Sequence, residues 1–290
     1  MEAKRAMQSL TRQDYLRGIN RVVEYINNHL DAPLSLEILA SESCFSPFHF
    51  HRIFKAFIGE TVGSYVQRVR LETAVHLLRY SELPIESIAT RVGYEMPSSL
   101  SKAFKNAYGI SPSEYRKQDN LQLRPLTANN ETINLQPPKI VPLPTQQVLY
   151  VHATGAYDEV DYAAQFAILW EQVRVQRLYT AGIEHIGLYY DCPTVTEADY
   201  LRTDLCLTIH KPAIPRGEVG VKEIEGGQYA VFLYRGSYDK LQCAYNFIFK
   251  TWLPDSRCTL RNLPVFEKFL SDARYTPLEK TKTEIYVPIE

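Results

Sequence analysis

Apolar and polar positions in the first 118 residues follow the period of an α-helix. Ile19, Val22, Val23, Ile26 and Leu30 recur every three or four residues, so they share one helical face. The same period continues from residue 62 to residue 79 without a proline, which predicts a long, stiff helix. The front of the chain is therefore predicted to be all α.

The pattern of residues 35–65 recurs in residues 84–115. The offset is 49 residues and becomes 50 after one inserted residue, with matches that include Ala40/Ala89, Phe54/Phe104, Gly59/Gly109 and Tyr65/Tyr115. Each copy reads helix, tight turn, helix. Because two copies are too few for a solenoid, the repeat predicts a duplicated helix-turn-helix module joined by the helix over 62–79.

The second helix of each copy leaves polar residues on its outer face. These are His51, Arg52 and Lys55 in the first copy and Ser98, Ser99, Ser101, Lys102 and Lys105 in the second. A helix fits the major groove of DNA, whose successive faces lie about 34 Å apart. Lys55 and Lys105 suit phosphate contacts, with Arg116 and Lys117 at the rim of the second copy. A packed helical protein with a solvated face is the plain alternative, but the matched basic positions favour double-stranded DNA as a partner.

The rear of the chain changes to a period of two and carries a second repeat. Residues 148–158 match 229–239 at an offset of 81, and residues 203–210 match 283–290 at an offset of 80. Alternation at Leu205, Leu207 and Ile209 predicts a strand with one buried face. We expect a multidomain chain: an all-α double helix-turn-helix domain over 10–118, a proline-containing linker over 119–136, and an α+β domain over 137–290 with an internal pseudo-twofold repeat.

Composition and charge agree with a folded intracellular protein. No apolar run approaches the roughly eighteen residues of a membrane span, and the N-terminus lacks the apolar core of a secretory signal. Five irregularly spaced cysteines predict reduced thiols and a cytoplasmic location. Up to Lys117 there are 15 basic against 12 acidic residues, and beyond it 17 against 21. The basic front and acidic rear indicate different partners for the two halves.

Aromatic residues and one carboxylate predict a ligand pocket in the rear domain. The aromatic candidates are Tyr157, Trp170, Tyr189, Tyr190, Tyr238 and Trp252. Glu267 stands between aromatic residues, where it could hold a lipophilic cation by charge and cation–π contact. The alternative is a surface strand residue paired with a nearby Lys or Arg. We expect no metal site at His49 and His51, because these residues are two apart on a helix and point in different directions. We also expect no cofactor.

The front motifs L-S-L-E-I-L-A, S-P-F-H-F-H-R-I-F-K and S-K-A-F-K…G-I-S-P-S-E-Y-R resemble the DNA-binding domain of the AraC/XylS transcription regulators. The resemblance covers about residues 18–117. It implies that Phe48, His51 and Arg52 of the first copy contact the DNA groove. It also implies that the matching helix of the second copy reads bases or contacts the DNA backbone through Ser98, Ser99, Ser101 and Lys102. It also implies RNA polymerase as a partner. Cys44 replaces the usual glycine, and serines replace the glutamines common at the second helix.

The rear pattern G-x-Y-D…W…F-E-K-F…T-E-I-Y-V-P-I-E resembles the GyrI-like effector-binding domain over about residues 138–290. That resemblance implies that Glu267 lies in the ligand pocket, and the combination of both halves resembles Rob-type regulators. We therefore expect a monomeric transcription regulator, an activator rather than an enzyme, whose rear domain binds a small-molecule effector. Two alternatives stay open: a GyrI-like hydrolase or ligand-sequestering protein tethered to DNA, and a rear domain that binds another protein.

Overall fold

The computed structural model describes residues 2–121, 133–193, 196–261, 263–271 and 275–290. The chain divides into two compact units, Met1–Gln122 with Pro215–Gly220 and Leu123–Ile214 with Val221–Glu290. Most of the predicted linker over 119–136 lies outside the described residues. No helix in the described ranges combines the length and apolar character needed to cross a bilayer.

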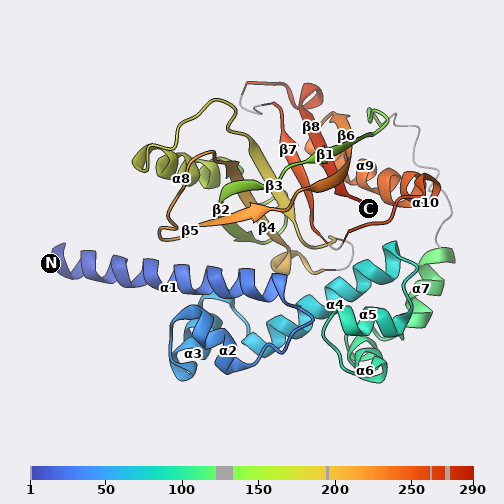
Figure 1. The fold of residues 1–290 in the computed structure, drawn as a ribbon, viewed down its shortest axis with the longest axis horizontal. Coiled ribbons are helices and arrows are strands. Elements are labelled where there is room, and N and C mark those ends of the chain that lie inside the picture. Colours follow the sequence, from blue (N-terminus) through green and yellow to red (C-terminus); the bar gives the residue numbers. More distant parts are fainter. Residues whose placement is uncertain (1, 122–132, 194–195, 262, 272–274) are drawn as a thin grey trace. The chain divides into compact units, whose positions relative to one another are not determined.

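The front unit is built from helices, as its period predicts (Figure 1). They are α1 (Glu2–Asn28), α2 (Leu36–Ser43), α3 (Pro47–Ile58), α4 (Val62–Tyr80), α5 (Ile85–Arg91), α6 (Pro97–Tyr108) and α7 (Pro112–Leu121). The repeat maps onto α2–α3 and α5–α6, with α4 as the connector. Ile19, Val22, Val23 and Ile26 of α1 are buried against the first pair, so the predicted apolar face is the core face.

Tight turns join the helices of each pair. Gly93 turns the second pair at a φ of 76°, a left-handed conformation that glycine adopts without strain. Cys44 occupies the matching turn at a φ of 60°, so a β-carbon is accommodated there at some steric cost. A capping box begins α7, because Ser111 and Glu114 bond each other's backbone N–H groups at 3.2 and 2.8 Å.

The rear unit is one eight-stranded sheet with helices on one face (Figure 1), and six of its neighbouring strand pairs are antiparallel. Its strands follow the order β1-β6-β8-β7-β3-β4-β2-β5. The elements are β1 (Lys139–Leu143), β2 (Gln146–Thr154), α8 (Tyr162–Val175), β3 (His185–Tyr189), β4 (Arg202–Thr208), β5 (Val219–Ile224), β6 (Gly227–Arg235), α9 (Leu241–Phe247), a π-helical turn (Ile248–Trp252), α10 (Leu253–Ser256), β7 (Val265–Phe269) and β8 (Lys282–Pro288).

The internal repeat is visible in the strand order. Strands β2, β3 and β4 form one half of the sheet and β6, β7 and β8 the other, with each outer strand β1 or β5 joined to the opposite half. The halves meet where β3 pairs with β7, and Gly187 lies directly opposite Glu267. These two residues are also 80 positions apart, the offset of the repeat. The pseudo-twofold axis therefore passes between them, and the predicted fold class is confirmed.

Candidate functional site

Both second helices present the predicted polar face to solvent. His51, Arg52 and Lys55 on α3 are exposed, and so are Ser98, Ser99, Lys102 and Lys105 on α6, whereas Ser101 is half-buried. The side chain of Phe48 lies outside the described part of the structure. On each helix the exposed residues recur at spacings of three and four, so they share one face. The opposite faces are anchored by Phe50 and Phe54 in α3 and by Leu100 and Phe104 in α6, all fully buried.

The ends of the two helices differ in one respect. The hydroxyl of Ser46 accepts a hydrogen bond from the His49 N–H and caps α3, whereas Met96 occupies the same position before α6 and provides no side-chain cap. Both helices begin with a proline and end at a left-handed glycine, Gly59 or Gly109. The two helices are therefore matched in length, and their chemistry differs at the positions that face outward.

Arg116 contacts the protein itself, whereas the sequence predicted that it lies beside Lys105 and Lys117 and contacts phosphate. That prediction is wrong. The guanidinium of Arg116 instead donates to the backbone carbonyl of Leu83 at 2.7 Å and to that of Leu78 at 3.4 Å. These bonds tie α7 to the end of α4. Arg116 is thus a structural residue of the module, because its donors are engaged within the protein.

Glu267 is the centre of a closed tyrosine cluster on the helix-covered face of the sheet. It lies on β7 and is only 2% exposed. The Tyr245 hydroxyl of α9 donates to its Oε1 at 2.7 Å, and Tyr189 of β3 also hydrogen-bonds the carboxylate. No ion pair joins Glu267 to a basic residue within the described ranges. The surface, salt-bridged interpretation of Glu267 is therefore wrong.

This environment changes the acidity of the carboxyl group. Burial raises the pKa of Glu267 from 4.5 to about 7, although the hydrogen bonds from Tyr245 and Tyr189 favour the ionised form. Burial and the neighbouring Glu267 raise the pKa of both tyrosines well above 10.0, so they remain neutral donors. Near neutral pH the site holds a carboxyl group that can change its charge.

Gly187 makes room for this arrangement. A β-carbon at Gly187 would lie 2.9 Å from the Tyr189 hydroxyl and 3.1 Å from its ring. The ring of Tyr189 therefore folds back over the strand, and its hydroxyl reaches the carboxylate opposite. At the pseudo-twofold axis the two equivalent positions face each other, so one holds the acid and the other holds no side chain.

Four other predicted ligand residues lie on this face of the sheet and divide into two groups. Tyr157 packs edge-on against Tyr189 at 4.9 Å between ring centroids, and Tyr238 packs against Phe269 at 6.2 Å. Both therefore border the Glu267 cluster. Trp170 donates to His185 at 3.0 Å, and Trp252 packs edge-on against Phe232 at 4.9 Å. Those tryptophans contact other parts of the same sheet face.

Tyr190 is placed on the opposite face, which corrects its inclusion in the aromatic pocket. Its hydroxyl donates to Asp204 at 2.6 Å. Asp204 also bonds His152 at 2.7 Å and forms a buried ion pair with Lys222 of β5. Burial alone would raise the pKa of Asp204, but Lys222 and His152 outweigh it and hold the pKa well below its usual range.

Sequence reasoning missed two members of the Glu267 cluster, Tyr245 and Tyr162. Tyr162 of α8 lies with its hydroxyl 3.3 Å from that of Tyr189. With 20 tyrosines in the chain, residue type did not single them out. The repeat does not indicate them either, because it pairs Tyr162 with Cys243 and Ala164 with Tyr245 at the offset of 81.

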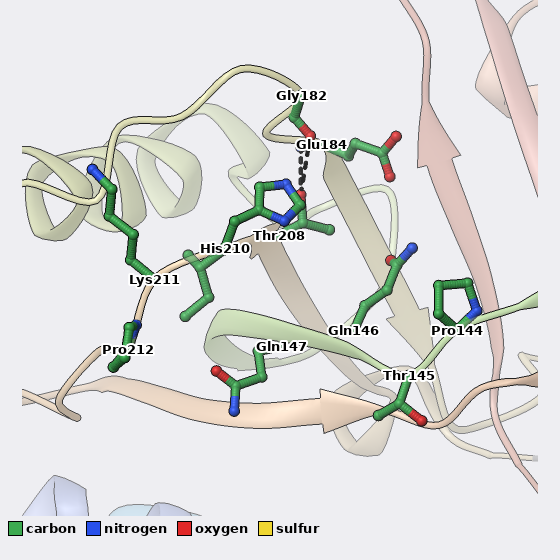
Figure 2. Close-up of a pocket in the computed structure, with 11 residues that line it drawn as sticks. Pro144, Thr145, Gln146, Gln147, Gly182, Glu184, Thr208, His210, Lys211 and Pro212 are labelled. Atoms are coloured by element: carbon green, nitrogen blue, oxygen red, sulfur yellow. Dashed lines mark hydrogen bonds between the residues drawn. The ribbon is translucent and has the colours of Figure 1, made fainter.

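A surface groove of about 460 Å³ lies elsewhere on the rear unit (Figure 2). It is lined by Pro144, Thr145, Gln146, Gln147, Gly182, Glu184, Thr208, Ile209, His210, Lys211 and Pro212. Glu184 forms an ion pair with Lys268, and Lys211 donates to two backbone carbonyls. Glu267 and the predicted aromatic residues do not line this groove, so it is a separate feature from the tyrosine cluster.

Metal-ligating residues do not gather in the part of the chain that the structure describes. No group of three or more His, Cys, Asp or Glu side chains there could hold a metal ion. The five cysteines carry free thiols.

Comparisons with known proteins match both halves. A model of the GyrI-like small molecule binding domain matches residues 136–290, and a helix-turn-helix domain model matches residues 39–118. The regulatory protein SoxS of Salmonella typhimurium is 34% identical over 98 residues, which are 34% of this chain and 92% of SoxS. The multiple antibiotic resistance protein MarA of Escherichia coli is 33% identical over 98 residues, 34% of this chain and 77% of MarA.

Among solved structures, the C-terminal domain of AraT, a response regulator from Geobacillus stearothermophilus, is 37% identical with a TM-score of 0.34. The match covers 35% of this chain and 84% of that one. The paired domains and the two regulatory relatives agree with the exposed polar faces of α3 and α6 and the buried cluster in the rear unit. The chain belongs to the AraC-type helix-turn-helix, DNA-binding transcription regulators that end in a GyrI-like small molecule binding domain.

Proposed function

We propose that this regulator is an activator that binds promoter DNA through α3 and α6 and binds a lipophilic organic cation at Glu267. It acts as a monomer in the cytoplasm, because the duplicated module already supplies two reading helices, and it recruits RNA polymerase. The observation that carries the effector proposal is Glu267 itself: a carboxyl group 2% exposed, hydrogen-bonded by tyrosines on the helix-covered face.

The electrostatics of Glu267 support a cationic effector. A buried carboxylate without a basic partner is costly, so the group takes up a proton and its pKa rises to about 7. A cation entering the cluster would replace that proton and stabilise the ionised form. The surrounding tyrosine faces, which carry partial negative charge, would add cation–π attraction and apolar contact. A neutral effector would gain none of the charge term.

Calorimetric titration of the full chain with tetraphenylphosphonium tests this proposal. We expect Glu267→Gln to weaken binding by about tenfold or more, because the amide keeps the shape and removes the charge. Glu279→Gln is the matched control, since it removes an acidic charge at an exposed position and should bind as the wild type does. Equal affinity in wild type and Glu267→Gln would remove Glu267 from the effector site.

The geometry of the front unit supports DNA reading by two helices of one chain. α3 and α6 have equal length and carry basic residues at matching exposed positions, Arg52 and Lys102. Salt-dependent retention of a promoter fragment should be lost in the Arg52→Ala, Lys102→Ala double variant. Specific binding as tight as that of the parent would show that the groove assignment is wrong.

A hydrolase is the second candidate, and one contact favours it. Tyr245 lies 2.7 Å from Glu267, whose pKa of about 7 suits a general base. Incubation of the full chain with activated esters or other electrophiles distinguishes the two functions. Turnover that Glu267→Gln abolishes would favour the enzyme, whereas binding without turnover would favour the sensor.

A further inference from the structure

One polar side chain beside the Glu267 cluster is buried without a partner. Thr283 of β8 is 0% exposed, and its hydroxyl has no hydrogen-bond partner among the described residues. Glu267 pairs with Ile285 and Phe269 pairs with Thr283, so Thr283 is two residues from the partner of Glu267. Side chains two apart on a strand share a face. Thr283 therefore points to the same helix-covered face as Glu267.

The internal repeat provides a reference for this hydroxyl. Thr203 of β4 is the equivalent residue, 80 positions earlier, and it is also 0% exposed. Its hydroxyl donates to the backbone carbonyl of Leu188 at 2.9 Å. Thr203 lies opposite Tyr189, as Thr283 lies opposite Phe269. The same residue in the same fold position is thus satisfied in one half and unsatisfied in the other.

The difference between Thr283 and Thr203 indicates that the Thr283 hydroxyl has a role other than stabilising the fold. A buried hydroxyl without a partner destabilises the folded chain, and a valine of the same shape would avoid that cost. Thr283 lies diagonally across the β7–β8 pair from Glu267, a geometry that separates side chains by about 7 Å. Phe269, which contacts both Tyr238 and Tyr162, lies directly opposite Thr283. The hydroxyl and the carboxyl group therefore border one aromatic cluster.

We propose that Thr283 is the second polar anchor of the effector site and donates its hydroxyl hydrogen to the ligand. This inference rests on the proposed cation site at Glu267 and narrows the class of ligand. The effector is an aromatic cation that carries a hydrogen-bond acceptor, such as a carbonyl or ether oxygen, roughly 7 Å from its charged centre. Glu267 selects the charge and Thr283 selects the acceptor.

Two probes that differ in one acceptor test the inference. They are para-acetylbenzyl-trimethylammonium and its isostere para-isopropylbenzyl-trimethylammonium, titrated by calorimetry into the full chain. We expect wild type to bind the acetyl probe about three- to tenfold more tightly, the effect of one hydrogen bond. Thr283→Val should reduce that ratio to about one. Thr203→Val is the matched control and should keep the ratio.

Thermal unfolding gives a second, independent readout. Thr283→Val should raise Tm by about 2–4 °C because it removes an unsatisfied hydroxyl, whereas Thr203→Val should lower Tm because it removes a hydrogen bond. Higher stability with lost ligand selectivity is the combination that a purely structural residue would not produce. A lowered Tm in Thr283→Val, or an unchanged probe ratio, would overturn the inference.

The titrations distinguish a wrong cation site from a wrong assignment of Thr283. If neither probe binds, or if Glu267→Gln leaves both affinities unchanged, the cation site itself is wrong and the role of Thr283 falls with it. If both probes bind through Glu267 and wild type does not distinguish them, the cation site stands and only the assignment of Thr283 is overturned.

Discussion

At the scale of single residues, packing around Glu267 controls the position of its proton. The folded chain holds the proton up to about pH 7, whereas the ordinary pKa of the group is 4.5. The folded state therefore binds more protons than the unfolded state between these values. It follows that the free energy of unfolding decreases as pH rises from about 4.5 through about 7.

A side chain that cannot ionise at position 267 should remove that pH dependence. Glu267→Gln cannot ionise, so its stability relative to wild type should increase by about 2–3 kcal/mol between pH 5 and pH 8. Urea unfolding at several pH values measures the difference. Parallel pH profiles for the two proteins would mean that Glu267 titrates as an ordinary exposed carboxylate.

The affinity for a cation should increase with pH, whereas the free energy of unfolding decreases, because cation binding requires the ionised form of Glu267. At pH 6 about one tenth of the groups are ionised for a pKa of about 7, and at pH 8 about nine tenths. We expect the affinity for tetraphenylphosphonium to increase about tenfold over this range. Glu267→Gln should have a flat profile, and a pH-independent affinity in wild type would contradict the prediction.

At the scale of elements, a buried ion pair joins the edge strand β5 to the sheet. Lys222 of β5 pairs with Asp204 of β4, which also accepts from Tyr190 and bonds His152. Lys222 also lies 4.6 Å from the centroid of the Tyr150 ring. Because the pKa of Asp204 is held low, the stabilisation by this pair is present above the ordinary pKa of an aspartate and is lost as pH falls.

Removing one partner of this pair should therefore be worse than removing both. We expect Lys222→Met to lower the free energy of unfolding by about 3–5 kcal/mol near neutral pH, because Asp204 stays buried without its cation. The double variant Lys222→Met, Asp204→Asn should recover part of the loss. Urea unfolding measures both effects, and a double variant as unstable as the sum of two single changes would contradict this explanation.

At the scale of the whole molecule, the duplicated helix-turn-helix module should allow one chain to bind DNA without forming a dimer. A monomer with α3 and α6 as reading helices should bind one duplex that contains two half-sites. Sedimentation of the protein with a promoter fragment should give one chain per duplex. Inserting half a helical turn, about five base pairs, between the half-sites should abolish tight binding, because one reading helix then faces away from its groove. Two chains per duplex would contradict the monomer proposal.

The sequence by itself determined the architecture and the main candidates. Helical period, strand alternation and two internal repeats are local signals, so they predicted an all-α front, an α+β rear and the outer faces of α3 and α6. Its place between aromatic residues singled out Glu267, whereas the strand pairing showed that Gly187 lies opposite it. Boundaries such as the capping box at Ser111 also depend on neighbouring residues alone.

Only the tertiary structure decided which side chains meet. Tyr245 and Tyr162 reach the Glu267 cluster from two helices far apart in sequence. Tyr190 lies on the other face with Asp204, because side chains alternate along the chain and Tyr189 lies on the Glu267 face. Arg116 is drawn inward by carbonyls at the end of α4 and just beyond it. The burial that raises the pKa of Glu267 comes from long-range packing, and a local pattern contains no information about which distant residues will provide it.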